Sequence, residues 1–214
     1  MKNLLIFTVL LSTNLLSGAN TLTPSSPIKI TRRRHEPKEY IKATLKLFKA
    51  KKGKTIIEIG SMRNPLNHDL KSGHCNSCLC GHSTLWWALS KAEVYSVDID
   101  DKSYNITKNA CKSYSNVRVV KQDGIDFLKK FKKPIDLLFL DAWDVNPKTN
   151  YAEMHLDAYL AAKDKLHEGS MILIDDTDIA NGGKGRLLRP VATKDGWEII
   201  FTGRQTLFIK KGAK

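Results

Sequence analysis

Apolar runs that carry an acidic residue near their C-terminal end recur along the chain. The clearest are TIIEIGS at residues 55–61, VYSVDID at 94–100 and IDLLFLDAWD at 135–144. Short apolar runs of this kind, separated by helical patterns, are typical of buried parallel strands. Because ligands bind at the carboxyl ends of the strands in an open α/β sheet, we expect these acids to face one shared crevice.

The rest of the pattern predicts a seven-stranded sheet with helices between most of its strands. Strands are expected at 56–59, about 93–99, 117–120, 135–140, 171–175, 197–203 and 206–211. Helices are expected around 83–91, 102–112, 124–132 and 151–166. The turn near Arg204 and Gln205 is too short for a crossover helix, so the last two strands should form a hairpin. We therefore predict a three-layer α/β sandwich whose sheet is mostly parallel, with an antiparallel last strand.

A basic segment precedes the first strand. Residues 29–54 hold eleven Lys or Arg against Glu36 and Glu39, so +9 of the net charge of +13 lies in this segment. Pro37 suits the first turn of a helix, and apolar side chains follow it at helical spacing. Such a concentration of charge indicates an anionic partner, either nucleic acid, an anionic membrane surface or an acidic substrate, or else a solvated helix face.

Residues 1–24 form a signal-like or membrane-associating segment. An apolar stretch follows Lys2, and small residues then resemble a secretory cleavage site at about Ala19. The stretch is shorter than the roughly 20 residues of a spanning helix. The basic residues after it favour the alternative, a membrane-associated chain with a cytoplasmic catalytic domain. Residues 25–52 would then be a basic linker and amphipathic helix, and residues 53–214 the main domain.

Candidate ligand-binding residues lie where the first three strands end. Glycines there let the backbone approach a ligand, and a helix N-terminus offers free N–H groups to a carboxylate. An acid at the end of the second strand can accept hydrogen bonds from two ribose hydroxyls, and one after the third strand could contact an adenine amino group. The candidates are Glu58, Gly60, Ser61, Gly81, His82, Ser83, Thr84, Asp98, Ile99, Asp123 and Gly124.

In order and spacing, these motifs resemble those of the class I S-adenosylmethionine-dependent methyltransferases. EIGS…GHSTLWWA is similar to the first motif of that family, VDID to the second and QDGIDFL to the third, within residues 55–211. The resemblance implies a Rossmann-like fold, S-adenosylmethionine as cofactor and methyl transfer as the reaction. A dinucleotide dehydrogenase would show G-x-G-x-x-G directly after the first strand, and this sequence does not.

FLDAWD and LIDDTD, separated by a long helix, resemble the catechol-type O-methyltransferases and their bacterial relatives. In metal-dependent members, residues at the positions of Asp141, Asp175 and Asp176 hold a divalent ion, which orients the acceptor hydroxyl. Oxygen ligands suit Mg²⁺. The chain departs from this pattern because Asp176 replaces an amide and Asp144 replaces the catalytic lysine. Asp141 and Asp144 are therefore the catalytic candidates, with Asp144 as a general base or an extra ligand, unless the acids only cap a strand end.

The glycine loop carries an insertion at residues 61–80, where the family usually has a few residues. Cys75, Cys78 and Cys80, with histidines nearby, could close a zinc site, form a disulfide in an exported chain or remain free thiols. The insertion could also be a lid over the substrate, with Arg63 and His68 as contacts.

Together these features favour transfer of a methyl group to an oxygen of a small molecule or sugar, with or without a metal. One alternative is an RNA or protein methyltransferase that uses the basic residues 29–54. The other is a membrane-associated binding module that has lost activity.

Overall fold

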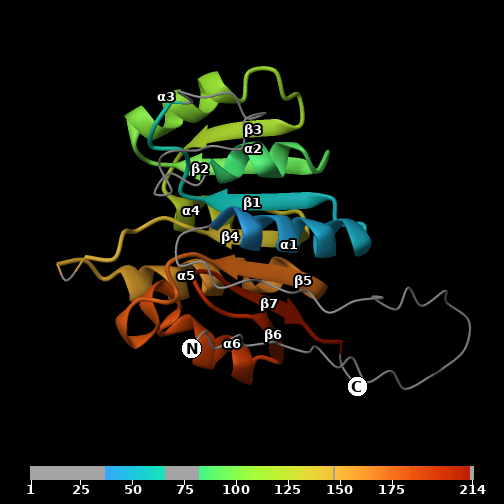
Figure 1. Ribbon diagram of the computed structural model, residues 1–214, viewed down its shortest axis with the longest axis vertical. Coiled ribbons are helices and arrows are strands. Elements are labelled where there is room, and N and C mark those ends of the chain that lie inside the picture. The colour runs from blue at the N-terminus through green and yellow to red at the C-terminus, as the bar shows by residue number, and fades with distance from the viewer. Residues whose placement is uncertain (1–36, 66–81, 147, 213–214) are drawn as a thin grey trace, which may run out of the picture.

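The computed structural model describes residues 37–65, 82–146 and 148–212. One seven-stranded sheet runs through them in the order β3-β2-β1-β4-β5-β7-β6 (Figure 1). The parallel strands are β1 (Thr55–Ile59), β2 (Glu93–Asp98), β3 (Val117–Lys121), β4 (Ile135–Leu140) and β5 (Leu166–Ile174). Antiparallel pairing joins β7 (Thr206–Lys210) to β5 and to β6 (Trp197–Phe201). The predicted Rossmann-like sheet with an antiparallel last strand is therefore confirmed.

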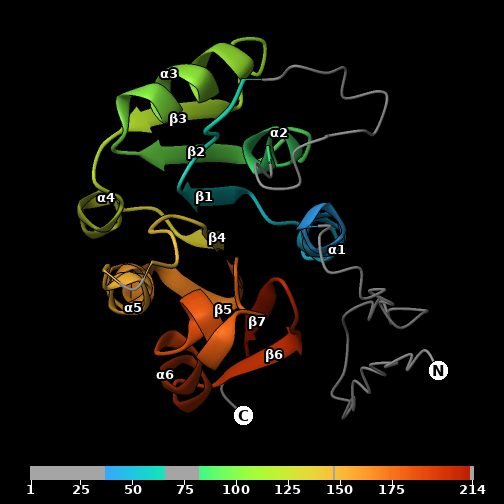
Figure 2. The same cartoon turned by 60° about the vertical axis from the view of Figure 1, so that its left-hand side comes forward.

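Helices cover both faces of the sheet (Figure 2). One face carries α1 (Pro37–Ala50), α2 (Ser83–Ala88) and α3 (Asp101–Ala110). The other carries α4 (Gly124–Lys130), α5 (Tyr151–Ala162) and α6 (Leu188–Lys194). Because the central strands are buried on both sides, they read in the sequence as continuous apolar runs.

Three elements differ from the sequence prediction. The sequence pattern does not predict the 3-10 helix η3 (Ala180–Gly185), whose backbone is non-helical at residues 181–183, or the seven-residue helix α6 that follows it. In addition, β5 begins at Leu166, well before the predicted residue 171, and it includes Gly169 with a φ of +82°. The pairing of β4 with β5 shifts register in this part of the strand.

Several predictions concern residues outside the described ranges. These are the segment 1–24, the linker up to residue 36, Gly81, and His68, Cys75, Cys78 and Cys80 of the inserted loop. Among the residues that the structure does describe, no helix is both long enough and apolar enough to cross a membrane.

The parallel pairing brings the C-terminal ends of the strands to one edge of the sheet. Leu140 and Ile174 are partners in the register of β4 and β5, so Asp141 and Asp175 follow them side by side. The ladder continues past the strand ends, since the Gly60 N–H donates to the Val97 carbonyl at 2.9 Å. The acids predicted to share a crevice therefore lie at one edge.

Candidate functional site

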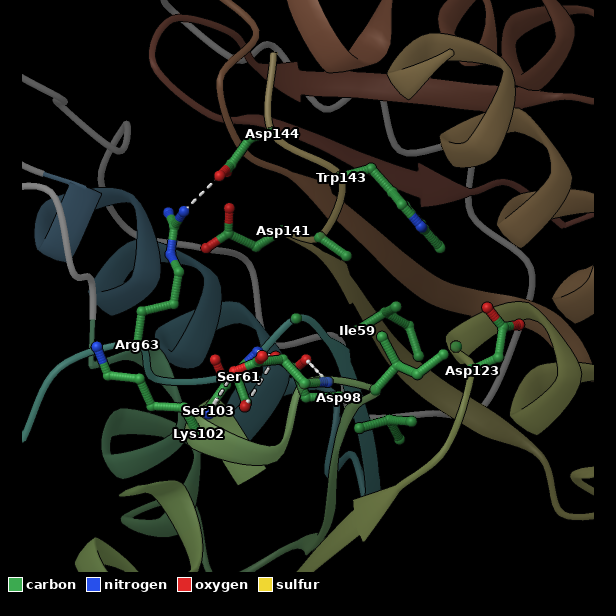
Figure 3. A pocket seen from close by; sticks show the side chains of 16 residues that line it. Ile59, Ser61, Arg63, Asp98, Lys102, Ser103, Asp123, Asp141, Trp143 and Asp144 are labelled. Carbon is green, nitrogen blue, oxygen red and sulfur yellow. Dashed lines mark hydrogen bonds and ion pairs between the residues drawn. The ribbon is translucent and has the colours of Figure 1, made fainter. Parts of the chain in front are cut away.

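A pocket of about 330 Å³ opens at the carboxyl ends of β1, β2 and β4 (Figure 3). This volume is within the range of small-molecule sites, about 300–1,000 Å³. The predicted residues that line it are Gly60, Ser61, Asp98, Ile99, Asp123, Gly124, Asp141 and Asp144. Residues not on the predicted site list also contribute, among them Lys102, Ser103 and Trp143.

Gly60 shapes the floor of the pocket. Its φ is +92°, and a Cβ there would lie 2.6 Å from the backbone nitrogen of Ala142. Only glycine combines this backbone conformation with so close an approach to the tip of β4. The chain can therefore turn at the end of β1 while the tips of β1 and β4 stay in contact.

Asp98 fixes the loop that follows β1. Its Oδ2 accepts hydrogen bonds from the backbone N–H of Ser61 at 2.8 Å and from the Ser61 hydroxyl at 3.0 Å. Its Oδ1 accepts from the backbone N–H of Asp100 at 2.9 Å. The carboxylate is thus held in the pocket wall, between the tips of β1 and β2 (Figure 3).

The start of α4 and Ile99 also line the pocket. Asp123 caps the helix, because its Oδ1 accepts from the backbone N–H of Asp126 at 2.9 Å. Gly124 allows the helix to approach β1, since a Cβ there would lie 2.3 Å from Cγ2 of Ile59. Ile99 lines the pocket and is 67% exposed, so it contributes an apolar surface to the pocket.

Three residues predicted to bind the ligand do not line the pocket, namely Glu58, Ser83 and Thr84. Glu58 is fully buried and accepts hydrogen bonds from the hydroxyls of Ser83, Thr84 and Ser96 and, at 3.0 Å, from the indole N–H of Trp87. Burial raises the pKa of Glu58 to about 7, against the lowering effect of the hydroxyl donors. These side chains face one another behind the pocket, where they join α2 to β1 and β2.

His82, predicted with them, is the residue before α2 and has a φ of 38°. It does not line the pocket, and burial lowers the pKa of its imidazole. The start of α2 therefore does not open into the described pocket.

Asp141, Asp175 and Asp176 come together at the tips of β4 and β5, as the metal hypothesis requires. One carboxylate oxygen from each lies within 4.8 Å of the others. Burial, and next the charge of Asp141, raise the pKa of Asp175 well above its ordinary value. Of the three, Asp141 is the one that also lines the pocket.

A lysine absent from the predicted site enters this cluster. Lys184 is fully buried, and its Nζ lies 2.9 Å from Oδ1 of Asp141 and 3.2 Å from Oδ2 of Asp176. Burial acts to lower the pKa of Lys184, but the charges of Asp141, Asp175 and Asp176 outweigh burial and raise it. The side chain is therefore an ammonium ion.

Arg204 and Gln205 complete the surroundings of the acids. The Arg204 guanidinium lies 2.5 Å from Oδ1 of Asp176 and 3.4 Å from Oδ2 of Asp175. The Gln205 amide donates to Oδ1 of Asp175 at 2.8 Å. Each carboxylate thus already has a cation or an amide as partner, and the arrangement does not fit a magnesium site.

The backbone of η3 explains how Lys184 reaches the cluster. Gly183 has a φ of +51° and a ψ of −136°, and a Cβ there would lie 1.8 Å from the carbonyl oxygen of Asp176. Asp176 itself has a φ of +50°. The signal in the sequence was a glycine-flanked lysine, NGGKG, soon after LIDDTD. Because lysines are almost never fully buried, such a segment is typical of a surface loop.

Asp144, at the position where the family pattern has a lysine, forms an ion pair with an arginine. Its Oδ2 lies 2.5 Å from a guanidinium nitrogen of Arg63, and both side chains are more than half exposed. Figure 3 shows this pair at one side of the pocket, with Asp141 close by.

The neighbouring Trp143 contacts the buried ring of His155, with ring centroids 5.2 Å apart. Burial, and next the charge of Lys184, lower the pKa of His155 to about 3, so the ring is neutral.

Residues 78–177 match the family model of a methyltransferase domain. No curated protein sequence matches the chain.

Three solved structures illustrate the similarity of fold. A methyltransferase of Podospora anserina, bound to S-adenosylhomocysteine, is 18% identical over 89% of this chain and 83% of that one, with a TM-score of 0.57. The magnesium protoporphyrin IX methyltransferase of Synechocystis PCC 6803, with bound S-adenosylmethionine, is 14% identical over 82% and 80%, with a TM-score of 0.55. An N-methyltransferase of Bradyrhizobium japonicum WM9 is 11% identical over 82% and 97%, with a TM-score of 0.52. At such identities the likeness concerns the fold alone.

Proposed function

We propose that the chain carries a class I S-adenosylmethionine-dependent methyltransferase domain and that it methylates an oxygen atom of a small molecule or sugar. The observation that carries the proposal is a single pocket with carboxylates at both ends. Asp98 stands at the end of β2, and Asp141 and Asp144 stand beyond β4.

At the cofactor end we assign contacts to the residues that line the pocket, namely Gly60, Ser61, Asp98, Ile99, Asp123 and Gly124. A carboxylate can accept about four hydrogen bonds. Ser61 and Asp100 donate three to Asp98, and one of these comes from a rotatable hydroxyl that ribose can replace. The exposed face of Ile99 suits adenine. When bound, S-adenosylmethionine supplies a methyl group made electrophilic by the positive sulfonium.

At the acceptor end, Asp141 is placed to accept a hydrogen bond from a hydroxyl and to take its proton as the oxygen attacks the methyl in line. The ion pair of Arg63 and Asp144 adds polar groups beside it. Carboxylate and guanidinium groups around a pocket of about 330 Å³ suit a small hydroxylated acceptor. The chain's own residues would thus orient the acceptor and hold its proton.

The exposed lysines of α1 support a second candidate, a methyltransferase that acts on RNA. Lys42, Lys46 and Lys49 are exposed on the helix surface turned away from the sheet. They lie on a separate element from the pocket lining, so we rank this candidate below a small acceptor.

The first test is calorimetric titration of S-adenosylmethionine into the wild type and D98A. Hydrogen bonds to a charged group contribute roughly 1.5–3 kcal/mol, so we expect D98A to bind about ten- to a hundredfold more weakly. D164A is the matched control, because the Asp164 side chain is 83% exposed and does not line the pocket. A wild type that binds no S-adenosylmethionine would favour the inactive binding module.

The acceptor class needs a second assay. The wild type should form S-adenosylhomocysteine when hydroxylated small molecules or sugars are supplied, and D141N should form much less. Methylation of RNA or protein, with none of any hydroxylated small molecule, would contradict this part of the proposal.

A further inference from the structure

We infer that the ammonium of Lys184 is the resident cation of the acidic cluster, and that methyl transfer by this chain does not depend on a divalent ion. Lys184 takes the place that the family resemblance assigns to Mg²⁺, between Asp141 and Asp176. For the role of Asp141 we rely on the proposed function, whereas the metal-binding behaviour of the cluster can be measured without it.

Three oxygen atoms surround the ammonium. An ammonium group has three N–H donors. It donates to the main-chain oxygen of Asp141 at 3.1 Å and to Oδ1 of Asp141 at 2.9 Å, and it forms an ion pair with Oδ2 of Asp176 at 3.2 Å. A fully buried lysine thus contacts two of the three carboxylates that a divalent ion would need as ligands.

The charges in the cluster also oppose a divalent ion. Three carboxylates stand against the two cations Lys184 and Arg204, which leaves at most one negative charge unmatched. A bound Mg²⁺ would place two further positive charges beside the ammonium, and like charges at such separations repel strongly. Binding would therefore require the expulsion of a buried side chain.

The local backbone is shaped to bring this lysine in. Gly183 lies so close to Asp176 that any Cβ would overlap the carbonyl oxygen, and the backbone N–H of Lys184 donates to that same oxygen at 3.3 Å. Burial of a lysine is costly unless it is paired. Both Gly183 and Asp176 have positive φ, and this conformation costs energy at Asp176 because it is not a glycine.

Lys184 acts on the reaction through Asp141. The ammonium holds Oδ1 and the main-chain carbonyl of Asp141, while part of the Asp141 side chain remains exposed in the pocket. Lys184 itself does not line the pocket. It is thus a positioning residue, which fixes one carboxylate oxygen and leaves the other for the acceptor.

The test is a titration with Mn²⁺, followed by electron paramagnetic resonance, because Mn²⁺ favours the same oxygen ligands as Mg²⁺. We expect the wild type to show no site at the cluster. K184M leaves the carboxylates without their central cation, and it should bind Mn²⁺ roughly tenfold or more tighter than the wild type. The double variant K184M/D141N should lose this site.

K163M is the matched control, because Lys163 also pairs with an aspartate, Asp195 at 2.8 Å, but at the surface. It should not gain a manganese site. A wild-type site that D141N removes would overturn the inference, and so would a folded K184M that gains none. If K184M does not fold, the comparison of wild type with D141N still decides.

Titration of S-adenosylmethionine into the same metal-free samples separates the two proposals. A wild type that binds neither Mn²⁺ nor S-adenosylmethionine would contradict the proposed function and support Lys184 as the cation of the cluster. A wild type that binds both, with Mn²⁺ binding lost in D141N, would support the proposed function and contradict the role of Lys184.

Discussion

Glu58 shows how a single buried residue supports the pocket without touching it. Four donors from α2 and β2 converge on its carboxyl group, which ties the start of α2 to the two strands that form the pocket wall. The same burial that makes these hydrogen bonds strong penalises the charge. The carboxyl group is therefore a pH-sensitive part of the folded state.

We expect the stability contributed by Glu58 to fall as pH rises. The folded pKa is about 7 and the ordinary value is 4.5, so between these values the folded state keeps a proton that the unfolded state has lost. The free energy of unfolding then decreases through this window, by up to about 3 kcal/mol. E58Q has no such titration, so the stability difference between wild type and E58Q should shrink from pH 5 to pH 8 in urea unfolding.

The control for this comparison is E198Q, because Glu198 is a partly exposed residue of the edge strand β6. Its stability difference from wild type should stay nearly constant over the same range. A difference for E58Q that is equally constant would contradict the raised pKa of Glu58.

At the scale of elements, α1 is held to the sheet by one apolar stripe. The buried side chains of this stripe are Tyr40, Ile41, Leu45 and Phe48. Phe48 is the last of them, and the turn after the helix leaves room for its ring, since a Cβ on Gly53 would lie 2.3 Å from it. The basic helix is thus an integral layer of the domain.

F48A should destabilise the protein by about 3–5 kcal/mol, because it removes a buried aromatic ring and leaves a cavity. K49A changes the next residue, which is exposed, and should stay within about 0.5 kcal/mol of the wild type. Urea unfolding of both variants measures this. A loss for F48A no larger than that for K49A would mean that α1 is not docked on the sheet.

At the scale of the whole molecule, the net charge of +13 is unevenly distributed. The stripe that docks α1 leaves its lysines facing outward, and Lys51, Lys52 and Lys54 continue the exposed basic surface toward β1. We propose that this surface attracts anionic partners, for which single-stranded RNA is a convenient probe.

Reversal of three charges in K42E/K46E/K49E should weaken RNA binding and lower the slope of log affinity against log salt by about 2. Fluorescence anisotropy at several salt concentrations measures this slope. K129E/K130E/K132E makes the same change in net charge at exposed lysines in and after α4, on the opposite face, and should have a smaller effect. Equal effects would indicate attraction by net charge alone.

Part of the site was determined by the sequence itself. Parallel strands need apolar residues on both faces and place their carboxyl ends together, so Gly60, Asp98, Asp123 and Asp141 could be assigned to one edge. Such assignments need only a local pattern and the rule that links it to the sheet. For the same reason the hairpin of β6 and β7 followed from a short connection.

The tertiary structure decided which side chains meet. Glu58 shares a face of β1 with Ile56, under α1 and α2, so it points away from the pocket although it lies in the first motif. Lys184 reaches Asp141 across 43 residues because Gly183 and Asp176 adopt positive φ. Local pattern carries no information on such contacts, since they depend on backbone turns between distant segments. The sequence therefore placed the acids, and only the folded chain supplied the cation between them.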